Sequence, residues 1–159
     1  MTMFTRQIGA ACRNFRLACV LAGILSLPGC GNKDKANLLP VEGKVLLGDN
    51  PLATDEHTKG TVALYPDKSK GNLSLEIPRG PIDAEGRFKI LTGLKAGAAP
   101  GWYKVTVDAA KVLDPKNPYH SASGFLMPIR YIDKDESNLA FEVVDNARPD
   151  AYDLKLDAK

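Results

Sequence analysis

Short runs of alternating apolar and polar residues, separated by turn-forming residues, occupy most of the chain after residue 40. Two-residue alternation places every second side chain on the same face of a strand, whereas a helix would show a repeat near 3.6 residues. Clusters of Gly, Pro, Asn and Asp between the runs are typical of tight turns. The sequence predicts an all-β sandwich of seven strands, at residues 41–47, 61–65, 73–77, 87–90, 102–107, 139–143 and 152–156.

The run at residues 102–107 has the clearest alternation. Its aromatic and β-branched face, which begins with Tyr103, is expected to point into the core. Trp102 then points outward. An exposed tryptophan is a candidate contact for a sugar or a partner protein, and the alternative is that Tyr119 or Phe125 covers its ring.

Residues 111–135 form the least regular segment, with three prolines and several aromatic side chains. A connection of this length without secondary structure is uncommon in a compact domain, and such loops are often functional. Tyr119 and Tyr131 are therefore candidates, together with Trp102, for a ligand-binding surface.

The first 29 residues have the layout of a secretory signal. Three arginines precede an uncharged run at residues 17–27, and no acidic residue occurs before Asp34. The run is far shorter than the roughly 20 apolar residues that a membrane-spanning helix requires. We therefore expect this segment to direct export.

The residues at the end of this run, Leu27-Pro28-Gly29-Cys30, resemble the lipobox of bacterial lipoproteins. The resemblance implies cleavage before Cys30 and a diacylglycerol on its sulfur. Cys12 and Cys19 lie in the segment that would be removed, so Cys30 would be the one cysteine left and could form no intramolecular disulfide. An ordinary signal peptide, cleaved at a nearby small residue, is the alternative.

These features divide the chain into a signal peptide (residues 1–29), a polar lipidated tether (30–40) and a β-sandwich (41–157). Gly31, rather than Asp, follows the cysteine, which implies sorting to the periplasmic side of the outer membrane if the usual rule applies. Removal of three arginines leaves 18 basic residues against 19 acidic ones. The domain is then nearly neutral, and no nucleic-acid partner is expected.

Several short motifs follow one another along the predicted sandwich, at residues 41–45, 51–52, 62–66, 83–88, 97–105, 130–131 and 152–154. In order and spacing they resemble the transthyretin-like or carboxypeptidase-regulatory-like domains found in small bacterial lipoproteins. The resemblance implies an immunoglobulin-like sandwich of transthyretin type. Such domains are usually accessory or structural modules without catalysis, so no cofactor is expected.

An enzymatic interpretation would start from Asp55, Glu56 and His57, because a carboxylate beside an imidazole can act as a base or a metal ligand. The other histidine, His120, is distant in the sequence, and two histidines without a cysteine give at most part of a metal site. A solvated loop is favoured there. Residues 133–136 lack the glycine and the terminal glutamate of a 12-residue calcium loop, so an acidic turn is favoured and no metal site is expected.

We expect a lipid-anchored β-sandwich, held on the membrane through Cys30, that acts as a structural or protein-interaction module of the cell envelope. Its expected partner is an envelope protein or glycan. The alternative is a glycan- or peptide-binding lipoprotein that uses residues 111–135 and Trp102. A metal-dependent hydrolase around His57 is the least favoured interpretation.

Overall fold

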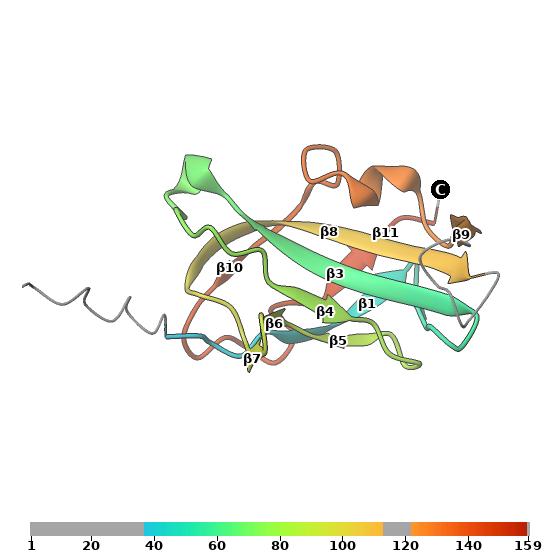
Figure 1. Ribbon diagram of the computed structural model, residues 1–159, viewed down its shortest axis with the longest axis horizontal. Coiled ribbons are helices and arrows are strands. Elements are labelled where there is room, and N and C mark those ends of the chain that lie inside the picture. The colour runs from blue at the N-terminus through green and yellow to red at the C-terminus, as the bar shows by residue number, and fades with distance from the viewer. Residues whose placement is uncertain (1–36, 113–121, 159) are drawn as a thin grey trace, which may run out of the picture. The chain divides into compact units, whose positions relative to one another are not determined.

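The computed structural model describes residues 37–112 and 122–158, which belong to one compact unit. They form eleven strands and two short 3-10 helices, and within these ranges there is no α-helix (Figure 1). The all-β prediction is confirmed. The elements are β1 (Glu42–Leu47), β2 (Asn50–Pro51), β3 (Thr58–Pro66), η1 (Lys68–Lys70), β4 (Arg79–Pro81), β5 (Arg87–Lys89), β6 (Leu91–Thr92), β7 (Lys95–Ala96), β8 (Gly101–Val112), β9 (Ala122–Phe125), η2 (Ile129–Ile132), β10 (Leu139–Val143) and β11 (Leu154–Leu156).

Strand β8, with 12 residues, is the longest strand and lies inside the larger sheet. The order of that sheet is β10-β8-β3-β4-β6-β7, and β9 also pairs with β8. β3 runs antiparallel to β8 over nine residue pairs, from Thr58 opposite Lys111 to Pro66 opposite Tyr103. On the other edge, β10 pairs with the first part of β8 and β9 with its last part. Both edges of β8 are therefore engaged.

The smaller sheet is built on β1, which pairs in parallel with β11 and antiparallel with β2 and β5. Val45 lies opposite Leu154 in the parallel pair. An isolated bridge between Ile82, which follows β4, and Phe88 of β5 connects the two sheets at one edge.

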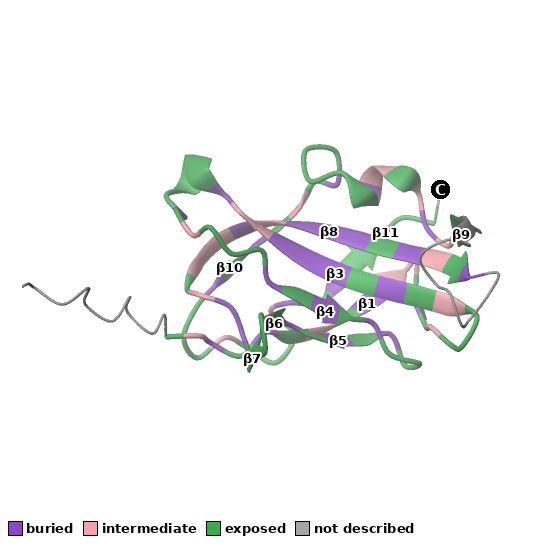
Figure 2. Ribbon diagram, in the orientation of Figure 1, coloured by how far each residue is buried: buried purple, intermediate pink, exposed green. Residues whose placement is uncertain are grey.

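Apolar side chains from both sheets form a single core. Val62, Val105 and Val107 of the larger sheet are fully buried, as is Val45 of the smaller sheet, and Phe88 is nearly so. Buried and more exposed positions alternate along much of β3 and β8 (Figure 2). This alternation confirms the predicted inward faces of these two strands.

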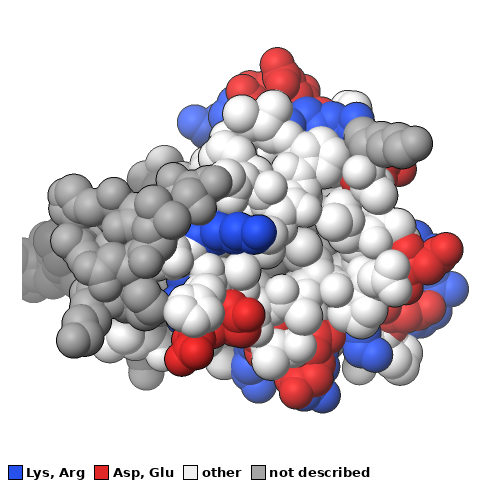
Figure 3. Space-filling model, turned by 90° about the vertical axis from the view of Figure 1, so that its right-hand side faces the viewer, with Lys and Arg blue, Asp and Glu red and all other residues white. Residues whose placement is uncertain are grey.

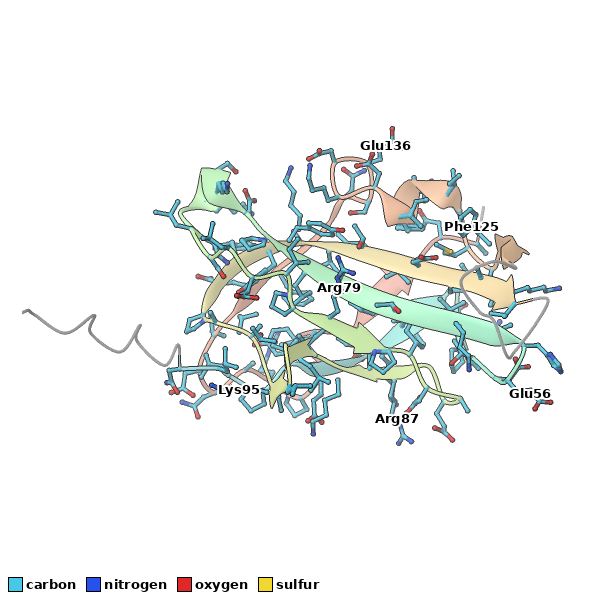
Figure 4. All side chains as sticks on the ribbon, viewed as in Figure 1. Glu56, Arg79, Arg87, Lys95, Phe125 and Glu136 are labelled. Carbon is cyan, nitrogen blue, oxygen red and sulfur yellow. The ribbon has the colours of Figure 1, made fainter. Side chains whose placement is uncertain are left out.

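The outward face of the larger sheet departs from the prediction at Thr106, which was expected to face solvent and is buried. Thr106 lies opposite Ala63 of β3, and Ala63 lies opposite Arg79 of β4. The labelled Arg79 in Figure 4 is therefore the next residue in this row. The aliphatic part of a long side chain on the same face can cover small neighbours, which gives a physical reason for the burial.

Six of the seven expected strands are present, and the additional ones are two to four residues long. The prediction of a strand at residues 73–77 is wrong, because this segment has no strand pairing and lies between η1 and β4 (Figure 1). The immunoglobulin-like, transthyretin-type arrangement stays a prediction.

The described part of the segment 111–135 contains β9 and η2. η2 contacts β8, and its residue Tyr131 is buried in the core. The Tyr131 hydroxyl accepts hydrogen bonds from the backbone N–H of Asp157 and from Arg130, each at 2.9 Å. Tyr131 therefore ties η2 to the chain that follows β11.

Candidate functional site

An open groove of about 490 Å³ lies where β3 ends. Its apolar lining comes from the end of β3 and from the segment before β4, namely Tyr65, Pro66, Leu75 and Ile77. Its basic lining comes from three separate places, η1, β8 and the turn after η2, and consists of Lys68, Lys104 and Lys134. Asp67 also lines the groove, which thus combines apolar walls with ammonium groups and one carboxylate.

The turn at η1 shapes one end of the groove. Asp67 is buried and caps the helix, because its Oδ1 accepts hydrogen bonds from the Ser69 N–H at 3.0 Å and from the Ser69 hydroxyl at 2.6 Å. The hydroxyl bond from Ser69 is the main reason that the pKa of Asp67 lies below its usual value. Gly71, with a φ of 84°, ends the turn in the left-handed region that glycine tolerates best. This local chemistry fixes the position of Lys68 and Lys70.

Asn72 joins this turn to β8. Its Nδ2 donates to the Trp102 carbonyl at 2.9 Å, and its Oδ1 accepts from the Ser74 N–H at 3.1 Å. The Ser74 hydroxyl in turn accepts from the Glu76 N–H at 3.2 Å. The chain after η1 is therefore held by local side-chain bonds rather than by a neighbouring strand.

The segment that follows Asn72 exposes large apolar side chains. Leu73 is 76% exposed, Leu75 is 90% exposed and Ile77 is 39% exposed. The backbone N–H and C=O groups of these three residues form no hydrogen bond with another described residue. The i, i+2, i+4 spacing of apolar residues marked this segment in the sequence. It did not predict that these side chains are exposed.

Trp102 lies beside the groove on the outward face of β8, two residues from Lys104, and is half-buried. Its expected outward direction is confirmed. The Lys70 ammonium stands 3.5 Å from the ring centroid, a cation–π contact that stabilises exposed sites by about 0.5–1 kcal/mol. Sequence reasoning missed Lys70 as the residue on this ring, because it comes from a turn 32 positions earlier.

The other aromatic candidates are not found beside Trp102. Phe125 lies opposite Ala110, eight residues along β8, at the other end of the strand (Figure 4). At about 3.4 Å per residue, this separation is roughly 27 Å. Tyr131 is in the core, so it does not line the groove. Tyr119 lies outside the described residues.

Seen from the β9 end, the described surface is largely uncharged in its middle, and most of its charged side chains lie toward the rim (Figure 3). Phe125 and Ile129 are exposed apolar residues of the chain around β9 and η2. The segment 111–135 is therefore divided. Its β9 part pairs with the far end of β8, whereas its acidic turn reaches the groove through Lys134.

Ion pairs join two lysines of the groove to the acidic turn at residues 133–136. Lys104 Nζ lies 2.7 Å from Asp135 Oδ1, and Lys134 contacts the other oxygen of Asp135. The hydrogen bond from Lys104, followed by that from Lys134, lowers the pKa of Asp135 from 3.8 to about 2. Both lysines are thereby held at the rim of the groove.

Oxygen atoms of Asp133 accept hydrogen bonds from backbone N–H groups of the residues that follow it. Asp133 Oδ1 accepts from the Asp135 N–H at 2.8 Å, and the Asp133 carbonyl accepts from the Ser137 N–H at 2.8 Å. These hydrogen bonds shape the turn at residues 133–136.

His57 lies in the loop before β3 with its side chain 64% exposed, and its Nε2 is 3.3 Å from Glu56. Asp55 Oδ1 accepts from the His57 N–H and from the Thr58 hydroxyl, each at 2.8 Å, and so shapes the loop. His120 lies outside the described residues. In the part of the chain that the structure describes, no three His, Cys, Asp or Glu residues come together as metal ligands.

Comparison of the chain with protein-family models, with curated proteins and with solved structures gave no match. Within the described ranges, no helix is long and apolar enough to cross a membrane. Cys30 and the predicted signal segment lie outside the described residues. Function is therefore inferred from the groove and from the sequence.

The Asp135 carboxylate gives a direct test of the groove geometry. We expect its pKa, measured by NMR titration, to be about 2 and to rise toward 3.8 in the variant Lys104→Met. Because the folded-state pKa is depressed, the stability that this carboxylate contributes is present above pH 3.8 and is lost as the pH falls through about 2. Lys155→Met, on β11, is the matched control and should leave this pKa unchanged. Equal titration of Asp135 in both variants would contradict the contact.

Proposed function

We propose that the protein is an exported, lipid-anchored module of the cell envelope that binds another protein through the groove beside Leu75 and has no catalytic activity of its own. The observation that carries the proposal is the exposed apolar segment along this groove. A leucine that is 90% exposed next to an apolar cleft gains free energy when a partner covers it.

The size of this gain supports a binding role. Full burial of one exposed leucine or isoleucine side chain is worth about 1.5–3 kcal/mol, before the costs of association are counted. Three such side chains follow one another at alternate positions, Leu73, Leu75 and Ile77. Lysines at the rim add charge selectivity, since they favour a partner with acidic groups at matching positions.

The predicted anchor fits a role at the envelope. Two or more acyl chains hold a protein stably on a membrane, whereas one binds only marginally. Leu39, the first core residue of the described domain, lies nine positions after Cys30. Such a connection spans at most about 30 Å. An anchored domain would therefore meet its partners close to the membrane surface.

Glycan or peptide binding is the second candidate, and the position of Trp102 beside the groove favours it. A sugar stacks on an open aromatic face, but Lys70 stands over this ring. A glycan would have to displace Lys70. A peptide strand could occupy the groove beside Leu75 without touching Trp102, so a protein or peptide partner agrees better with the described contacts.

The anchor is tested by replacing its cysteine. Cys30→Ser is expected to remove the site of lipidation, so that the protein leaves the membrane fraction or accumulates unprocessed. Fractionation of cells and the mass of the protein measure both results. Cys12→Ser, inside the predicted signal, is the control and should remain membrane-bound. Normal partitioning and processing of Cys30→Ser would contradict the anchor.

The groove is tested with the variant Leu75→Asp. We expect the tagged full-length variant, isolated from detergent-solubilised envelope, to lose its bound protein, because a carboxylate replaces an apolar contact. Its melting temperature should remain that of the wild type, since Leu75 is exposed. Leu94→Asp, at a side chain that is 102% exposed in the turn between β6 and β7, is the matched control. Equal recovery with both variants, measured by quantitative mass spectrometry, would overturn the proposed function.

A further inference from the structure

The segment Leu73 to Ile77 has the sequence of a strand, but among the described residues no strand pairs with it. Apolar residues alternate with Ser74 and Glu76, which is the pattern of a strand with one buried face. In the structure the apolar side chains are exposed, and no described strand pairs with the segment. A row of unpaired backbone groups on an apolar strand is a template for pairing with another chain.

The hydrogen bonds of the backbone N–H groups also alternate from one residue of the segment to the next. The Ser74 N–H is bonded to the Asn72 side chain, and the Glu76 N–H is bonded to the Ser74 side chain. The N–H groups of Leu73, Leu75 and Ile77 form no bond with another described residue. Once a partner strand draws this segment into an extended conformation, the N–H and C=O groups of alternate residues point to the same edge, so these three residues would then present one ladder edge.

We propose that this segment pairs antiparallel with the same segment of a second copy of this chain, around a two-fold axis at Leu75. The inference rests on the proposed function and names the partner that the groove binds. Main-chain hydrogen bonds between the copies would form a two-stranded antiparallel ribbon that joins the two domains. A two-fold axis makes the contact self-complementary.

The register follows from the sequence. A two-fold axis perpendicular to the paired strands places one residue opposite itself, which leaves Ser74, Leu75 or Glu76 as the centre. Centring on Glu76 puts two carboxylates opposite each other, which is destabilising. Centring on Ser74 places Ile77 opposite Gly71 and forms two apolar pairs. Centring on Leu75 forms three, because Leu73 and Ile77 then lie opposite each other twice.

Charge complementarity supports the same register and a second copy as occupant. With Leu75 at the axis, Glu76 of one copy lies opposite Ser74 of the other. Ser74 lines the groove that Lys68, Lys104 and Lys134 also line. Asp67 also lines this groove, and Asp135 pairs with Lys104 and Lys134, so the three lysines leave one positive charge in excess. Glu76 of the other copy meets this excess charge, and symmetry makes the contact twice.

The test places a photo-crosslinking benzoylphenylalanine at position 75 of the full-length chain, with two differently tagged copies in the same cells. The expected product carries both tags. The same crosslinker at position 94, which is equally exposed, should yield at least about tenfold less of this product. Crosslinking requires close contact, and position 94 lies outside the proposed contact between the copies. A product with one tag and a different protein would overturn the second copy as partner while leaving the proposed function standing. No product above that of position 94 would overturn both.

Charge reversal tests the register. Glu76→Lys should lower the yield of the doubly tagged product by at least about fivefold, because each copy then places a lysine against the basic groove of the other. Glu56→Lys is the matched control, since Glu56 is an exposed glutamate of the loop before β3 (Figure 4). Equal yields from the two variants would overturn the Leu75-centred pairing.

Discussion

Backbone pairing along both edges of β8 organises the larger sheet. β3 follows one edge over nine residue pairs, and β10 and β9 divide the other edge between them. Between those two strands, the Leu126 N–H donates to the Ala109 carbonyl and the Ser137 hydroxyl donates to the Val105 carbonyl. The strand therefore determines which side chains enter the core and which reach the outward face, and it sets the distance between the groove and β9.

The parts of the fold that follow from local pattern could be predicted from the sequence. Alternation identified the inward face of β8, and turn-forming residues separate the expected strands, as at 83–86. Asp83 Oδ1 accepts from the N–H groups of Glu85 and Arg87, and Gly86 has a φ of 75°, as such a turn requires. Each of these features depends on residues within a few positions of one another.

The sequence-based predictions were wrong where the environment of a residue depends on residues distant in the sequence. Residues 73–77 have the alternation of a strand, but the pattern does not contain the strand that must pair with it. Tyr131 stands among loop residues, and only its hydrogen bond with Asp157, 26 positions later, shows why it is buried. The outward direction of Trp102 was predictable from alternation. The Lys70 contact was not, because it depends on the tertiary arrangement of η1.

The groove and the unpaired segment share three residues, Ser74, Leu75 and Ile77. A domain that is anchored by lipid and pairs with a second copy through this segment would be a structural component of the envelope. Amide hydrogen exchange of the full-length chain, resolved residue by residue and measured at rising protein concentration, tests this central claim most directly. The account predicts that protection of the Leu73, Leu75 and Ile77 amides rises with concentration, while that of β8 stays constant. Unprotected amides at all three residues across the whole concentration range would contradict it.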